Sequence, residues 1–129
     1  MAEKEVTQME RNEDVIPDSY PLGPDGPSQQ EVDSLKKKYG KVRAAFTGSK
    51  VYVVRMMSRS EHMALQNEIF ERTEANDTDL DVDYIIAKDF TIWPSTINWD
   101  KEPGGAVPVL SQEVSKLSGF VKDKESIEL

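Results

Sequence analysis

The sequence of 129 residues contains no cysteine, one histidine and no long hydrophobic run. Without cysteine, the chain cannot form disulfides, zinc–cysteine sites, iron–sulfur clusters or a cysteine nucleophile. A membrane-spanning helix needs about 18 consecutive apolar residues, and no segment approaches that length. The first residues, MAEKEVTQMERNED, are acidic and polar, unlike a secretory signal or a transit peptide. We therefore expect a soluble intracellular protein.

Basic residues are outnumbered, with 16 lysines and arginines against 24 aspartates and glutamates, for a net charge of −8. This balance argues against general attraction to nucleic acid or to an anionic membrane. The net charge is −7 for residues 1–34, +7 for residues 35–57 and −8 for residues 58–129. Hydrophobic residues make up 37% and charged residues 31%. This composition is typical of one small folded core with polar extensions.

The N-terminal segment, residues 1–34, is predicted to be disordered. It has four prolines between residues 17 and 27, and its few apolar side chains follow no sustained period. Burying them would hardly offset the backbone entropy lost on ordering, about 1–2 kcal/mol per residue. The alternative is a segment that docks on a partner through residues 15–16 and 20–22. The C-terminal residues 121–129 are predicted to be a flexible charged tail.

The folded part is expected to start near Val32, and a β-hairpin is predicted within residues 41–57. Val42, Ala44 and Phe46 alternate with other residues, and the turn signal Thr-Gly-Ser-Lys follows at residues 47–50. Residues 51–54, Val-Tyr-Val-Val, are β-branched or aromatic and favour a strand. Because this run is continuous rather than alternating, we expect the second strand to be partly buried on both faces.

Two helices are predicted next. Ser58 and Glu61 have the spacing of a capping box, which starts a helix that runs to about Arg72. The second helix is expected over residues 79–89, with Thr78 as its cap and an Asp-rich first turn. It must end before the Trp-Pro pair at residues 93–94, because a proline disfavours a helical residue before it.

The last predicted helix begins at Pro108, since proline suits the first turn of a helix. Leu110, Val114 and Leu117 form its apolar stripe. Gly119 is expected to end it in a left-handed conformation, with Phe120 packing back on the last turn. The sequence therefore predicts an α+β fold: a small β-hairpin and about three helices in a domain of residues 35–120, flanked by the disordered acidic N-terminal segment and the charged C-terminal tail.

The acidic run between the first two helices resembles a calcium-binding loop only in part. Asp77, Asp79 and Asp81 match the opening of an EF-hand. The sixth and twelfth positions, which need glycine and glutamate, are Val82 and Lys88. We therefore expect no metal site here, and a helix start instead.

Catalytic patterns are lacking. His62 has no serine or cysteine arrangement to serve as a general base, so a partly exposed helix position is its ordinary role. Gly104 and Gly105 precede a helix, but the lysine and hydroxyl of a phosphate-binding loop are missing. The protein is expected to be no enzyme and to need no cofactor or metal ion.

A basic block with interleaved aromatic residues could bind single-stranded nucleic acid. Its candidate residues are Lys36, Lys37, Lys38, Lys41, Arg43, Lys50 and Arg55. The same charges could instead form an ordinary surface, pair with the acidic blocks on either side, or meet an acidic protein partner. The net charge of −8 weakens the nucleic-acid interpretation. Trp93 and Trp99 are either core residues or interface anchors.

Three stretches, VYVVRMMSRSEHMAL, IIAKDFTIWP and GGAVPVLSQEVSKLSGF, occur in this order. Over about residues 51–120 they resemble the tail assembly chaperones of long-tailed bacteriophages. In that family a hairpin, a helix with a charged start, an acidic spacer, a helix ending in Trp-Pro, a Gly-rich loop and a helix closing with Ser-Gly-Phe follow one another. Residues 1–34 and the strongly basic hairpin depart from the family pattern.

The resemblance implies a non-catalytic protein that binds the helical tape-measure protein and leaves as tube subunits polymerise around it. The expected partner-binding residues are Trp93, Trp99, Leu110, Val114, Leu117 and Phe120. The expected location is the host cytoplasm during assembly, with no membrane partner. One alternative is a structural tail or baseplate subunit retained in the virion tail. Another is a small nucleic-acid-binding module that uses the basic hairpin.

Overall fold

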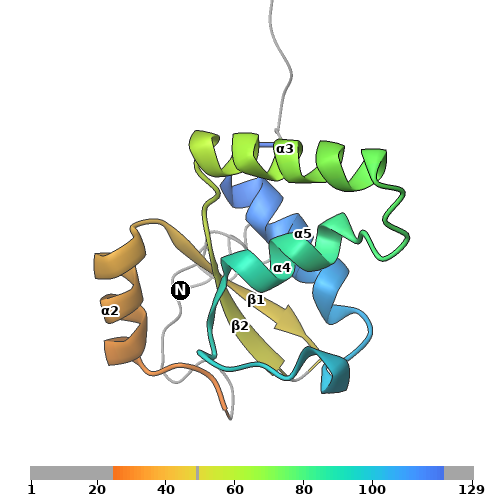
Figure 1. The fold of residues 1–129 in the computed structure, drawn as a ribbon. Helices are drawn as coiled ribbons and strands as arrows, with labels where there is room; N and C mark the ends of the chain where they lie inside the picture. Colours follow the sequence, from red (N-terminus) through yellow and green to blue (C-terminus); the bar gives the residue numbers. More distant parts are fainter. Residues whose placement is uncertain (1–24, 49, 121–129) are drawn as a thin grey trace, which may run out of the picture.

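The computed structural model describes residues 25–48 and 50–120. The predicted C-terminal tail and most of the predicted disordered segment lie outside these residues. The elements, in chain order, are α2 (Gln29–Tyr39), β1 (Val42–Thr47), β2 (Lys50–Arg55), α3 (Arg59–Glu74), α4 (Val82–Phe90), β3 (Thr91–Trp93), the short 3-10 helix η1 (Trp99–Lys101) and α5 (Ala106–Leu117) (Figure 1). The predicted α+β class is confirmed. No helix among the described residues is long and apolar enough to span a membrane.

The sheet has three antiparallel strands in the order β1-β2-β3. The predicted hairpin is present, and Thr47 pairs with Lys50 at the predicted turn. Gly48 has a φ of 60°, which a glycine adopts at little cost. Residues 51–54 of β2 are all buried, which confirms the predicted burial of this strand on both faces. The sequence did not indicate β3, because three residues directly after a helix are too few for a periodic pattern.

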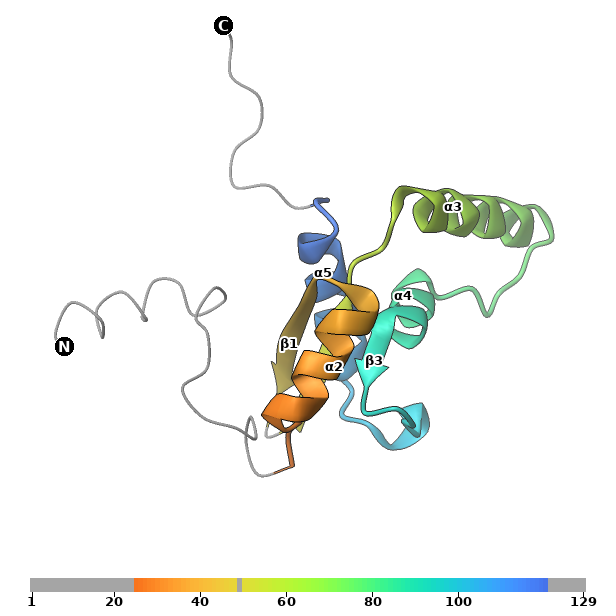
Figure 2. The same cartoon turned by 90° about the vertical axis from the view of Figure 1, so that its left-hand side faces the viewer.

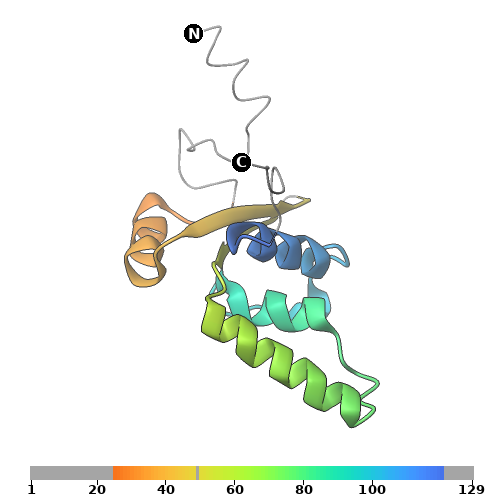
Figure 3. The same ribbon diagram turned by 90° about the horizontal axis from the view of Figure 1, so that it is seen from above.

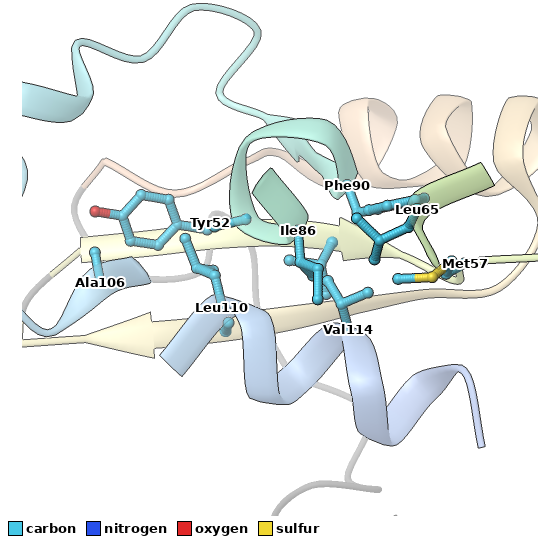
Figure 4. Packing of buried hydrophobic residues seen from close by; sticks show 11 residues of the cluster. Tyr52, Met57, Leu65, Ile86, Phe90, Ala106, Leu110 and Val114 are labelled. Carbon is cyan, nitrogen blue, oxygen red and sulfur yellow. The ribbon is translucent and has the colours of Figure 1, made fainter. Parts of the chain in front are cut away.

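The helices cover both faces of this sheet. α4 and α5 pack on one face, and α3 lies beyond them as the outermost layer (Figure 3). α2 lies on the other side of the strands (Figure 2). The core sits between the sheet and α4 and α5, where Tyr52, Ile86, Leu110 and Val114 point toward one another (Figure 4).

Helix α2 corrects the predicted domain boundary, because residues 28–34 belong to the folded domain. The Ser28 hydroxyl accepts the Glu31 N–H at 3.2 Å, and the Glu31 carboxylate accepts the Ser28 N–H at 2.9 Å. This is a complete capping box. Val32 then buries its side chain against the rest of the domain. The local Ser-x-x-Glu signal was present, but the proline-rich composition around it pointed to disorder.

The start of α3 is confirmed, whereas two other helix starts differ from prediction. Ser58 and Glu61 form the predicted capping box. Helix α4 is capped by Asp81, whose carboxylate accepts the Tyr84 N–H at 3.1 Å, and not by Thr78. Helix α5 begins two residues before Pro108. The proline is tolerated there because the first N–H groups of a helix have no intrahelical acceptor.

The predicted left-handed end of α5 at Gly119 is confirmed. Gly119 has a φ of 90°, in the left-handed region. The Phe120 N–H donates to the Ser115 carbonyl at 2.9 Å, and the Gly119 N–H donates to the Lys116 carbonyl at 3.2 Å. These two hydrogen bonds define a Schellman motif, which satisfies carbonyls that the helix leaves free.

Candidate protein interaction surfaces

The apolar stripe of α5 is core and not a contact surface, which corrects three of the predicted partner-binding residues. Leu110 and Val114 have no exposed surface, and Leu117 is also buried. Their i, i+4, i+7 spacing did predict one helix face correctly. That face is turned toward the sheet and α4, because α5 lies directly on the strands (Figure 4).

The other predicted contact residues do not form one groove. Trp99 is half-buried against the core and meets the Tyr84 ring edge-on, with centroids 6.1 Å apart. Trp93 lies opposite Val53 in β3. Phe120 is about half-exposed, but it follows α5 whereas Trp99 precedes it. A helix of 12 residues is about 18 Å long, so the structure separates these two aromatic residues.

Trp93 has a local role instead. Its indole N–H points to the Glu31 carboxylate of α2, with a nitrogen–oxygen distance of 3.4 Å. Hydrogen bonds from the Ser28 N–H, from Trp93 and from the Ser28 hydroxyl lower the pKa of Glu31. Trp93 therefore helps to join α2 to the sheet.

Three of the residues predicted to form a basic surface are paired with glutamates of this chain. Arg43, Lys50 and Arg55 form ion pairs, at 3.8, 3.1 and 2.8 Å, with Glu113, Glu102 and Glu61 respectively. Pairing with the acidic blocks was one alternative left open by the sequence. The exposed lysines that remain are at the C-terminal end of α2, where the helix dipole favours positive charge. They are Lys36, Lys37, Lys38 and the nearby Lys41.

Tyr52 and Glu102 form the most buried polar contact between β2 and the loop before α5. The Tyr52 hydroxyl donates to the Glu102 carboxylate, and the Lys50 ammonium donates to both carboxylate oxygens at 3.1 Å. Burial and the bond to Glu102 raise the pKa of Tyr52 to about 12. The bonds from Tyr52 and Lys50 lower the pKa of Glu102. The three groups hold the loop on the sheet.

The acidic run before α4 also has structural partners. Asp77 accepts from Arg72 at 2.7 Å and from the Asp79 N–H at 2.9 Å. Asp83 accepts from the Ser111 hydroxyl of α5 at 2.8 Å, and Asp81 caps α4. Within residues 25–48 and 50–120, no three His, Asp or Glu side chains are grouped to hold a metal ion.

Helix α3 presents apolar side chains to solvent that the sequence interpretation missed. Of its 16 residues, only Leu65 is buried. Met63 is 50% exposed and Phe70 is 65% exposed. At about 100° per residue, positions seven apart point in nearly the same direction, and Leu65 points almost the opposite way. We call Met63 and Phe70 the outer face of α3. Their spacing opposite Leu65 was the signal available in the sequence.

On its inner side, α3 borders an open hollow of about 360 Å³, which we call the α3–α4 groove. Its lining residues are Arg55, Glu61, Ala64, Leu65, Glu68, Asp89 and Phe90. At one end, the Arg55 guanidinium lies 4.5 Å from the centre of the Phe90 ring. Hydrogen bonds from Arg55 and from the Ser58 N–H lower the pKa of Glu61 to about 2. The groove thus combines apolar side chains with three carboxylates and one arginine, Arg55, which is paired with Glu61.

Comparisons with protein-family models, with curated proteins and with solved structures found no match to this chain. The interpretation of these surfaces therefore depends on the chain's own residues.

Proposed function

We propose that this protein is a non-enzymatic assembly protein of a bacteriophage tail, and that it acts as a chaperone for the tape-measure protein. The order of sequence motifs over residues 51–120 supports the proposal through its resemblance to tail assembly chaperones. Its site of action would be the host cytoplasm during assembly. The observation that carries the proposed binding role is the outer face of α3.

A helix that contributes one buried residue to its own domain is poorly explained by stability alone. α3 holds Met63 and Phe70 in solvent, and it forms the outermost layer of the domain. Exposed large apolar side chains on one helix face are typical of surfaces that meet another protein. The amphipathic helices of a tape-measure protein offer a matching apolar stripe, and the net charge of −8 would keep the complex soluble.

Co-expression with the tape-measure protein tests this role. We expect the wild-type chain to keep the tape-measure protein in the soluble fraction and to co-purify with it. The double variant Met63→Ser, Phe70→Ser should weaken this complex about tenfold or more, because truncating the few residues that dominate an interface costs more than about 1 kcal/mol each. The matched control is Phe46→Ser. Phe46 is 59% exposed but lies on the hairpin.

Two results would contradict the proposal at different levels. Failure of the wild-type chain to capture the tape-measure protein would reject the chaperone role. Equal capture by the α3 double variant and by the wild type would be compatible with the chaperone role and would reject the outer face of α3 as the binding surface. Mass spectrometry of purified virions separates the structural alternative, because a tail or baseplate subunit would be present at fixed stoichiometry and a chaperone would be absent.

A further inference from the structure

We propose that the α3–α4 groove binds an arginine side chain from the protein partner. The inference rests on the proposed function, since it specifies the chemistry of one contact made by the assembly partner. It concerns a different surface from the outer face of α3, which presents only apolar anchors.

The two walls of the groove come from different elements. Glu61, Ala64, Leu65 and Glu68 recur at i, i+3, i+4 and i+7 and form one stripe of α3. The opposite wall is the C-terminal end of α4, with Asp89 and Phe90. The volume of about 360 Å³ lies near the lower end of small-molecule pockets, which span roughly 300–1,000 Å³. The groove is therefore suited to a long side chain and is too small for a whole helix.

The charge in the groove is unbalanced. Arg55 is its only lining cation, and both of its bonded nitrogens are directed to Glu61, at 3.0 and 2.8 Å. Glu68 is exposed and has one polar contact, to Arg72 at 3.2 Å, and Arg72 also pairs with Asp77. Glu61 and Glu68 are thus each paired with an arginine of this chain, whereas Asp89 on the opposite wall has no such pair among the described residues.

Asp89 is the groove residue that most favours binding of a cation from outside the chain. It is exposed in the last turn of α4, where the negative end of the helix dipole disfavours a carboxylate. The structure gives it no hydrogen bond or ion pair with another described residue. A cation bound beside Asp89 would offset the helix dipole and the neighbouring carboxylate together.

Arginine fits this arrangement better than lysine or a simple ion. Its apolar stem can lie along Ala64 and Leu65 while its charged end stays near water. Its guanidinium has several N–H donors in one plane, so it can donate to Glu68 and Asp89 at once. At the end of the groove, Arg55 shows that a guanidinium is accommodated over Phe90 and against the Glu61 carboxylate. Phosphate groups would be repelled by the same carboxylates.

A peptide titration tests the proposal without the natural partner. The probe is a synthetic Ala- and Leu-rich helical peptide of about 18 residues, long enough to form a helix in water, with one central arginine. The control peptide carries citrulline, the uncharged analogue of arginine, at the same position. We expect the arginine peptide to shift the amide NMR signals of Ala64, Leu65 and Phe90 in the full chain. Citrulline should weaken binding about tenfold, as expected for the loss of one charged contact.

Matched variants locate the contact. Asp89→Asn and Glu68→Gln should each weaken binding of the arginine peptide several-fold. Glu71→Gln on α3 and Asp100→Asn in η1 remove the same charge from exposed positions outside the groove, and they should bind as the wild type does. All four positions are exposed, and unchanged amide spectra away from the substitution would verify the fold.

Two outcomes would overturn the inference: equal affinity for both peptides, or shifts confined to the outer face of α3. The proposed function is judged separately by capture of the tape-measure protein. Capture that is unchanged in Glu68→Gln and Asp89→Asn would reject the groove and keep the chaperone role. Arginine-specific peptide binding without capture would reject the chaperone role and keep the groove.

Discussion

Arg55, the last residue of β2, donates hydrogen bonds to both carboxylate oxygens of Glu61 in the first turn of α3, at 3.0 and 2.8 Å. The same carboxylate accepts the Ser58 N–H at 2.9 Å and so completes the capping box. One side chain therefore both starts α3 and ties it to the sheet. This matters because Leu65 is the only residue of α3 that is buried.

The first prediction concerns acid stability. The pKa of Glu61 is about 2 in the folded protein, below its ordinary value of 4.5. A carboxyl group with a lowered folded-state pKa stabilises the fold above the unfolded-state value, and this contribution is lost as the pH falls toward 2. Because the Glu61 side chain is about one third exposed, we expect a contribution of only about 1 kcal/mol.

The measurement is urea unfolding of the wild type and of Glu61→Gln at about pH 7 and about pH 3. Glu31, Asp77 and Glu102 also have lowered pKa values, so both proteins should lose stability in acid. The wild type should lose more than the variant, by at most about 1 kcal/mol at this pH. Equal losses would show that the Arg55–Glu61 pair contributes nothing measurable.

The second prediction concerns Tyr52. Its pKa of about 12, against 10.0 for an ordinary tyrosine, means that it ionises at higher pH. A raised pKa of a neutral acid stabilises the fold below the unfolded-state value, and this contribution is lost as the pH rises toward 12. In a spectroscopic titration, one tyrosine should ionise late, and Tyr52→Phe should remove that step. A titration that is the same in Tyr52→Phe would contradict the assigned environment.

The third prediction tests the reassignment of α5 from contact surface to core. Leu110→Ala should lower the free energy of unfolding by about 2–5 kcal/mol, because it removes buried methyl groups and leaves a cavity. Phe70→Ser, on the exposed face of α3, should change it by about 0.5 kcal/mol or less. Denaturant unfolding of both variants measures the contrast. A small effect of Leu110→Ala would contradict the assignment of this residue to the core.

The fourth prediction tests α2. Ser28→Ala removes the hydroxyl that accepts the Glu31 N–H, and loss of such a cap typically costs about 1 kcal/mol. Ser34→Ala is the control, because Ser34 is an exposed serine within the same helix. Thermal or urea unfolding should separate the two variants. Identical midpoints would mean that α2 adds no stability to the domain.

Elements with local causes could be predicted from the sequence. The hairpin turn at residues 47–50, the capping box at Ser58 and the left-handed Gly119 each depend on residues within a few positions of one another. Such signals can be read along the chain because turn and cap geometry restrict which residues fit. The capping box at Ser28 is of the same kind, and only the composition around it concealed it.

Only the tertiary structure shows which helix faces are buried in the core and which are exposed to solvent. The spacing of the apolar residues predicted that they share one face of α5. Whether that face contacts the sheet or a partner depends on where α5 packs. The partners of Arg43 and Lys50 are some 50 or more positions away, at Glu113 and Glu102. The α3–α4 groove exists because the end of α4 lies beside α3. These relationships are long-range contacts, which local propensity does not encode, so the candidate site emerged only from the fold.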